Sequence, residues 1–283
     1  MHIESAAASC FVKVNGLNIH YLDNDSNKPV LVLMHGLTAN SRTFDGIVEK
    51  LRHSFRVIRP DFRGNGLSDK PLTGYSMDTH AKDIVDLIKH LEEPRVYLAG
   101  HSFGGYVAMY IAANYPEYVS KLVILDAAKS MNPNAALMLS KAISRLDTVY
   151  PDFESYIEQV KEAPYLSPWD PAMVGYYRAD VMDLPGGKVK SRGNISTITQ
   201  KSMGLGAVKW TETIKRIQQP TVLVNATGIY TMGEALLPAN IAKETVGMMK
   251  HAGYIGVDGN HQTMLYGNGA LQIAHILKEF LPV

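Results

Sequence analysis

The stretch 100–104, which reads GHSFG, carries the side chain of this sequence best placed for chemistry. It follows the apolar run 96–99 and precedes small residues at helical spacing. In a G-x-S-x-G turn between a strand and a helix, the glycines allow close backbone approach and the serine hydroxyl stands clear of the sheet edge. The N–H of Phe103 then points toward whatever the serine attacks. We therefore predict that Ser102 is a nucleophile.

A serine hydroxyl is a weak nucleophile at neutral pH and needs a base within hydrogen-bond reach. Of the ten histidines, His261 lies just beyond the expected strand 254–257. In a parallel sheet the ends of successive strands meet at one edge, so this histidine lies on the same edge as Ser102. His275, in contrast, falls inside the expected helix 269–281. We predict that His261 is the base that accepts the serine proton.

The elements that must position these residues alternate along the chain. Two strands are expected around the turn Asn15-Gly16, a strong hairpin signal, and continuous apolar runs indicate further buried strands at 30–34, 55–58, 96–99, 122–125, 220–224 and 254–257. Helical spacing of apolar residues indicates intervening helices at 41–51, 77–91, 236–249 and 269–281. This alternation predicts an α/β fold with a doubly wound, mainly parallel sheet.

The alternation stops over residues 130–212, which contain no strand signal, both tryptophans and many tyrosines and methionines. Weak helical patterns occur at 134–146 and 152–162. We predict a helical lid over residues 130–212, inserted after the sixth strand, and one core domain formed by 1–129 and 213–283. Methionine and aromatic side chains fill irregular apolar pockets, so such a lid suits an apolar acyl group.

Composition excludes several classes of function. The chain has 283 residues, of which 46% are hydrophobic and 19% charged, so it can bury a large core, and its net charge of +1 gives no sign of a nucleic-acid partner. The single cysteine, Cys10, excludes an intrachain disulfide and the usual cysteine-based metal sites. No secretory signal and no membrane span are visible, so a cytoplasmic location is expected. No G-x-G-x-x-G motif follows the first strand, and no cofactor or metal is expected.

Four ordered motifs make the chain similar to the α/β-hydrolase superfamily, from about residue 9 to the end. They are the GHSFG turn, His35-Gly36, the loop 61–68 and the late His261. The resemblance implies a mainly parallel eight-stranded sheet flanked by helices. It also implies that the N–H groups of Leu37 and Phe103 form an oxyanion hole, in which two fixed donors stabilise the tetrahedral intermediate.

The acid that orients the histidine departs from the family pattern. The family places an aspartate after the seventh strand, but residues 225–230 contain no carboxylate. Glu234 has the family spacing to Pro238 after a small insertion, and Asp126 closes the strand before the lid, where some family members carry the acid. An aspartate held at a strand end is better pre-organised than a glutamate on a glycine-containing loop. Asp126 is therefore favoured, Glu234 is the alternative and Asp258 ranks third.

These residues predict a serine hydrolase, a carboxylic ester hydrolase that cleaves a small, mostly apolar ester or lactone through an acyl-enzyme. Two alternatives remain: a C–C bond hydrolase of ring-cleavage diketones, and a non-hydrolytic ligand receptor on the same fold. Serine at position 102 argues against epoxide hydrolase and haloalkane dehalogenase activity, because those family members place an aspartate there. The expected partner is a small-molecule substrate, with the chain a monomer or homodimer.

Overall fold

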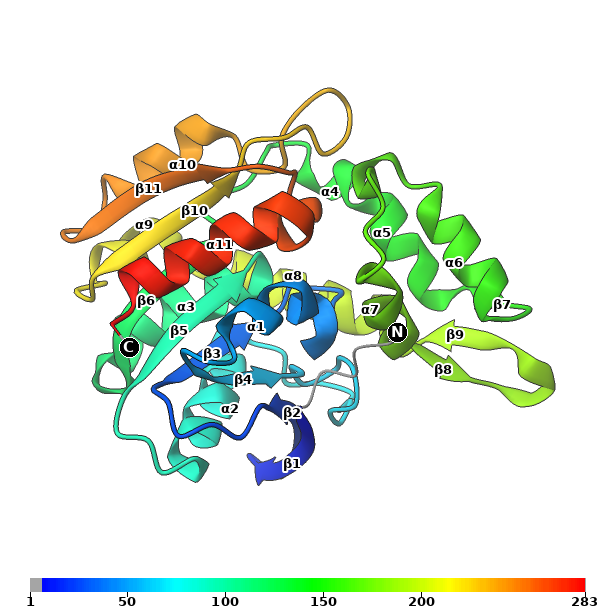
Figure 1. Cartoon of the computed structure of the whole chain (residues 1–283), viewed down its shortest axis with the longest axis horizontal. Helices are drawn as coiled ribbons and strands as arrows, with labels where there is room; N and C mark the ends of the chain where they lie inside the picture. Colours follow the sequence, from blue (N-terminus) through cyan, green and yellow to red (C-terminus); the bar gives the residue numbers. More distant parts are fainter. Residues whose placement is uncertain (1–6, 283) are drawn as a thin grey trace.

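A sheet of eight strands forms the centre of the computed structural model, which describes residues 7–282 (Figure 1). The strands lie in the order β1-β2-β4-β3-β5-β6-β10-β11. Their bounds are β1 Ala8–Val14, β2 Leu17–Asp23, β3 Val30–Met34, β4 Arg56–Pro60, β5 Val96–His101, β6 Val119–Leu125, β10 Thr221–Ala226 and β11 Ala252–Val257. From β4 to β11 all neighbours are parallel, whereas β2 is antiparallel to both of its neighbours, β1 and β4. The predicted α/β-hydrolase fold, with a mainly parallel eight-stranded sheet, is confirmed.

The hairpin at the edge of the sheet forms where the sequence predicts it. Val14 pairs with Leu17, and the two residues between them, Asn15 and Gly16, have φ angles of 48° and 77°. Two consecutive positive φ values define a type I′ turn, whose twist matches that of the flanking strands.

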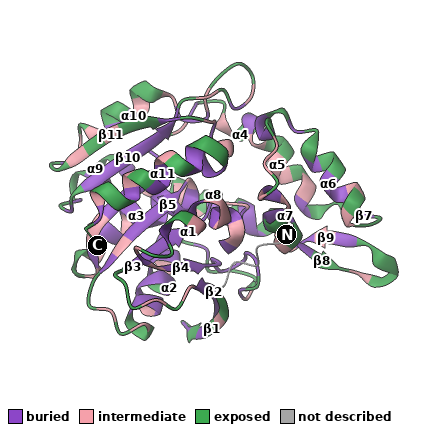
Figure 2. Cartoon of the chain, viewed as in Figure 1, coloured by how far each residue is buried: buried purple, intermediate pink, exposed green. Residues whose placement is uncertain are grey.

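Helices cover both faces of the sheet because successive strand residues point to opposite faces. Leu31 and Leu33 of β3 belong to one core cluster, whereas Val32 belongs to the other. Helices α1 (Asp45–Leu51) and α11 (Gly267–Phe280) share the first cluster. The second includes residues of α2 (Met77–His90), α3 (Phe103–Asn114), α9 (Trp210–Lys215) and α10 (Ala239–Val246). The central strands are accordingly buried (Figure 2).

In the main sheet, β6 and β10 are separated in sequence by a region of short elements, residues 130–212, which we call the inserted segment. Its helices are α4 Ala135–Met138, α5 Ser140–Ser144, α6 Phe153–Lys161, α7 Met173–Asp180 and α8 Ile195–Gly206. The expectation that it lacks strands is wrong. A small antiparallel sheet forms in the order β7-β9-β8, from Val149–Tyr150, Val189–Ser191 and Val181–Asp183. Strands of two or three residues are too short to show an alternating pattern.

Within residues 7–282, no helix combines the length and apolar character needed to cross a bilayer. Strands β5, β6 and β11 run parallel and end at the same edge of the sheet. The loops that follow these three ends carry Ser102, Asp126 and His261. The fold therefore brings together residues that are up to 159 positions apart in sequence, counting from 102 to 261.

Candidate active site

Ser102 occupies a strained turn between β5 and α3. Its φ of 53° and ψ of −117° lie outside the regions that ordinary residues prefer. A Cβ atom at Gly100 would lie 2.1 Å from the carbonyl oxygen of Gly104, and one at Gly104 would lie 2.1 Å from that of Met34. Only glycine fits at these two positions. The serine N–H donates to the Leu125 carbonyl at 2.9 Å, which ties the turn to the end of β6.

The imidazole of His261 is held by a buried carboxylate. Its Nδ1 lies 2.7 Å from Oδ2 of Asp126, while Oδ1 accepts hydrogen bonds of 2.8 Å from the Asn225 amide and from the Ala226 N–H. An ionised carboxylate only accepts hydrogen bonds, so Nδ1 of the histidine carries the proton and donates it. The other ring nitrogen, Nε2, is then the one that can act as a base.

The other two candidate acids lie elsewhere. Glu234 is exposed, and its Oε2 accepts a 2.6 Å hydrogen bond from Asn132. Asp258 is also exposed, and it accepts a 3.1 Å hydrogen bond from Gln272 of α11. Within the described part of the chain, no hydrogen bond or ion pair joins either carboxylate to His261. The structure therefore brings Asp126, and not its two alternatives, to the histidine.

The loop after β3 presents Leu37 beside the turn of Ser102. His35 holds this loop: its Nε2 accepts from the Phe62 N–H at 3.1 Å, so Nδ1 carries the proton and donates to the Gly36 carbonyl at 2.7 Å. Burial lowers the pKa of His35 to about 4, which keeps this bracing imidazole neutral. Phe103 is the first residue of α3, so its N–H has no acceptor within the helix.

A cavity of about 270 Å³ brings these groups together. Ser102, His261, Leu37 and Phe103 all line it. Much of the remaining wall is apolar and comes from the inserted segment, including Leu139, Ala142, Ile143 and Leu205. Among the described residues that line this cavity there is no aspartate, glutamate, lysine or arginine. The cavity suits a small uncharged group rather than an anion.

Aromatic side chains pack around the ring of His261. The Tyr230 ring meets it edge-on at 5.9 Å between centroids, and Tyr165 of the inserted segment stacks on Tyr230 at 4.7 Å. The His101 ring lies 4.5 Å away, and its Nε2 donates to the His261 carbonyl at 2.8 Å. Burial holds the pKa of His101 well below its usual value. These contacts restrict the orientation of the His261 imidazole, which a base of this kind requires.

Asn225 is a site residue that sequence reasoning missed. It is the second-last residue of β10, in the stretch where the family pattern would give a carboxylate, and both polar atoms of its side chain form hydrogen bonds. Its amide donates to Asp126 and, at 3.1 Å, to the Leu237 carbonyl, while its Oδ1 accepts from the Tyr254 hydroxyl at 3.0 Å. The signal in the sequence was its place at the end of the strand next to β6, which puts a neutral donor beside Asp126.

Lys201 on α8 is a second residue that the sequence did not single out. It is fully buried, its Nζ donates to Oδ1 of Asn65, and it lies 5.7 Å from the centre of the Phe103 ring. Burial and the charge of Lys70 lower the pKa of Lys201 well below its usual value. The Asn65 amide in turn donates to the Leu37 carbonyl at 3.1 Å. One chain of contacts thus links the inserted segment to both residues of the predicted oxyanion hole.

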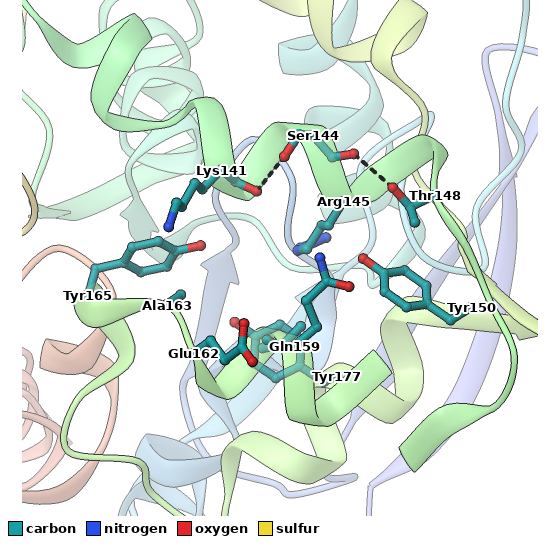
Figure 3. A pocket seen from close by; sticks show the side chains of 11 residues that line it. Lys141, Ser144, Arg145, Thr148, Tyr150, Gln159, Glu162, Ala163, Tyr165 and Tyr177 are labelled. Atoms are coloured by element: carbon teal, nitrogen blue, oxygen red, sulfur yellow. Dashed lines mark hydrogen bonds between the residues drawn. The ribbon is translucent and has the colours of Figure 1, made fainter. Parts of the chain in front are cut away.

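A second cavity, of about 280 Å³, lies within the inserted segment (Figure 3). Its lining is rich in polar side chains, and the Arg145 guanidinium there pairs with Asp180 at 3.2 Å. Lys141 and Ser144 of α5 face this cavity, whereas Ala142 and Ile143 of the same helix line the cavity beside Ser102. None of the predicted site residues lines the second cavity, so the first one is the candidate active site.

Comparison with known proteins places the chain among hydrolases. A sequence model of the family described as alpha/beta hydrolase fold matches residues 29–228. A soluble epoxide hydrolase from Corynebacterium sp. is 40% identical over 113 residues, which are 40% of this chain and 39% of that protein. A 2-(acetamidomethylene)succinate hydrolase from Mesorhizobium japonicum is 34% identical over 127 residues, 45% of this chain and 46% of that protein. The chain thus spans less than half the length of these curated relatives.

Solved structures extend the similarity to the whole fold. The structure of E-2-(acetamidomethylene)succinate hydrolase superposes with a TM-score of 0.83 at 23% identity, covering 97% of this chain and 99% of that one. The enol-lactonase from Burkholderia xenovorans gives a TM-score of 0.74 at 18% identity, covering 96% and 99%. At such low identities the likeness concerns the fold alone. Because the family match covers more than half of the sequence, this chain belongs to the alpha/beta hydrolase family.

Proposed function

We propose that the protein is a serine hydrolase that cleaves a small, mostly apolar carboxylic ester or lactone through an acyl-enzyme. The observation that carries the proposal is the 2.7 Å hydrogen bond between His261 and Asp126, beside a cavity that His261 shares with Ser102. A histidine oriented in this way can activate a serine, and a strained strand-to-helix turn is where a family nucleophile sits.

The proposed reaction needs only groups of this chain and water. Nε2 of His261 takes the hydroxyl proton as Oγ of Ser102 bonds to the substrate carbonyl carbon. The N–H groups of Leu37 and Phe103 stabilise the oxyanion, and Asp126 stabilises the imidazolium. The intermediate collapses when the alcohol leaves with the proton from His261. Water, deprotonated by the same histidine, then releases the acid and restores the serine.

The uncharged wall of the cavity supports a neutral acyl group as the substrate. The relative from Mesorhizobium japonicum acts on a derivative of succinate, as its name states, and therefore on a dicarboxylate. A buried carboxylate needs a paired cation or several hydrogen bonds to offset its lost hydration. The described lining of the cavity beside Ser102 holds no lysine or arginine. We infer that the substrate of this chain differs in charge from that of its relative.

Epoxide hydrolysis is not proposed despite the Corynebacterium relative. Family members with that activity place an aspartate at the nucleophile position, and this chain has Ser102 there. The similarity to that relative covers 40% of the chain, so it does not transfer the activity. C–C bond hydrolysis remains the alternative, because it uses the same serine, histidine and aspartate.

We further propose that residues 130–212 form a lid on a core made of 1–129 and 213–283. The proposal is supported by the side chains that this segment contributes to the cavity wall, from α4, α5, α7 and α8. The lid would then determine which acyl groups fit, because the catalytic groups themselves lie outside it. The core side contributes Ser102 and His261.

The substrate class is tested with p-nitrophenyl acetate, butyrate and octanoate, followed by release of p-nitrophenol. We expect turnover of the acetate and butyrate esters and a lower kcat/KM for the octanoate, because the cavity holds only about 270 Å³. A Ser144→Ala variant is a matched control, since Ser144 lines the other cavity. Cleavage of a ring-cleavage diketone with no turnover of any ester would instead favour the C–C hydrolase.

A further inference from the structure

A second chain of serine, histidine and aspartate lies on the antiparallel side of the sheet. Oγ of Ser9 on β1 is 2.9 Å from Nε2 of His20 on β2, and Nδ1 of His20 is 2.7 Å from Oδ2 of Asp61, which follows β4. Strands β1, β2 and β4 are neighbours in the sheet. The order of contacts reproduces that of a serine activated by a histidine and an aspartate.

The protons in this chain can be assigned from the partners of Asp61. Its carboxylate also accepts from the N–H of Ser41 at 2.6 Å and from that of Leu67 at 2.9 Å. Burial alone would raise the pKa of Asp61, but the hydrogen bonds that it accepts from His20 and from the Leu67 N–H oppose this and the pKa falls to about 2. The aspartate is therefore ionised, so Nδ1 of His20 donates to it. The lone pair of Nε2 is left to accept the proton of the Ser9 hydroxyl.

The serine of this chain is accessible although its partners are not. Ser9 is exposed, whereas His20 and Asp61 are 3% and 2% exposed. All three line a small cavity of about 80 Å³, whose wall also includes Arg42. A reagent can therefore reach the hydroxyl while the base behind it stays shielded from water.

We propose that Ser9 is a second nucleophile, which His20 and Asp61 activate to take the acyl group of a small activated carboxylic ester. Oγ of Ser9 bonds to the carbonyl carbon and its proton passes to Nε2 of His20. The bond between that carbon and the leaving oxygen breaks, and the leaving group takes the proton from His20. The products are an ester on Ser9 and a free alcohol or phenol.

This second centre differs from the first in the hydrogen-bond donors that it offers to the oxyanion. The backbone N–H groups of Ser41 and Leu67 already donate to Asp61, so they are not free to stabilise a tetrahedral intermediate. Positive charge near the cavity comes from Arg42, which pairs with Asp45 at 3.4 Å. With these two N–H groups occupied, both acylation and release should be slow. The ester on Ser9 should therefore accumulate as a modification, with little turnover.

The test uses the Ser102→Ala variant of the full chain, so that labelling does not depend on the proposed active site. It is incubated with p-nitrophenyl acetate, digested, and mapped by tandem mass spectrometry. We expect acetylation of Ser9 about a hundredfold faster than that of Ser144, as general-base assistance gives. Ser144 is the internal control, because it is exposed and donates only to the Lys141 carbonyl.

Two further variants separate activation from mere exposure. In the Ser102→Ala background, His20→Gln should reduce labelling of Ser9 to the level of Ser144. In Ser9→Cys, the introduced thiol should react with iodoacetamide faster than the thiol of Ser144→Cys, which replaces another exposed serine that has no imidazole partner; this measurement needs no change at the buried His20. Equal labelling of Ser9 and Ser144, or a thiol at position 9 no faster than one at position 144, would overturn the proposal.

Discussion

Replacing Ser102 by alanine should lower kcat for p-nitrophenyl butyrate by about a millionfold, to the residual rate that the oxyanion hole and substrate binding alone provide. The alanine removes the atom that forms the acyl-enzyme and leaves His261 with no hydroxyl to deprotonate. The loss should appear in kcat/KM as well, because the interaction exists only on the path to the transition state. Steady-state release of p-nitrophenol measures both constants.

The control for this variant is a measurement that shows it is still folded. Alanine at position 102 must adopt the same positive φ as serine, so the thermal unfolding midpoint should change little. The cavity beside it should still bind an uncleaved ester analogue. A folded Ser102→Ala variant that retains ester turnover beyond the slow labelling of Ser9 would show that another residue is the nucleophile.

Replacing Asp126 by asparagine should lower kcat by about 10⁴-fold. The carboxylate accepts the Nδ1 proton of His261 at 2.7 Å, and an amide can instead offer a donor to that nitrogen. The histidine would then adopt the tautomer whose Nε2 carries the proton, and this form cannot act as the base. The measurement is kcat across pH with the butyrate ester.

Glu234→Gln is the matched control for Asp126→Asn, because Glu234 was the alternative acid. It is exposed and bonded to Asn132, so its replacement should change kcat less than about threefold, as surface substitutions away from a site do. A large loss in Glu234→Gln together with a small one in Asp126→Asn would assign the acid to the loop instead. Comparable small losses in both variants would contradict any role of these carboxylates in orienting His261.

The main sheet was predictable because its signals are local. The I′ hairpin at Asn15-Gly16, the five buried residues of β3 and the GHSFG turn each follow from a few adjacent residues. Parallel strands then place the ends of β5, β6 and β11 at one edge without further information. The sequence therefore sufficed to predict that Ser102 and His261 share an edge of the sheet.

Other features depend on contacts between distant residues, which no local pattern contains. The choice between Asp126 and Glu234 depends on which side chain reaches His261, and this follows from loop geometry. The hydrogen bond from Lys201 to Asn65 joins residues that are 136 positions apart in sequence. Strands β7, β8 and β9 have only two or three residues, which is too short to show the alternation of apolar and polar residues that indicates a strand. The chain from Ser9 to Asp61 likewise forms only when three strands align.

The uncharged wall of the active-site cavity also bears on how the reaction ends. Ester hydrolysis turns a neutral substrate into a carboxylate. This acid product forms in a cavity whose described lining contains no lysine or arginine. Keeping an unpaired anion away from water costs several kcal/mol. The acid should thus leave readily, and butyrate should inhibit the enzyme more weakly than an uncharged analogue of the same size, such as butyramide. Product inhibition assays compare the two, and the charge created by the reaction would itself drive release.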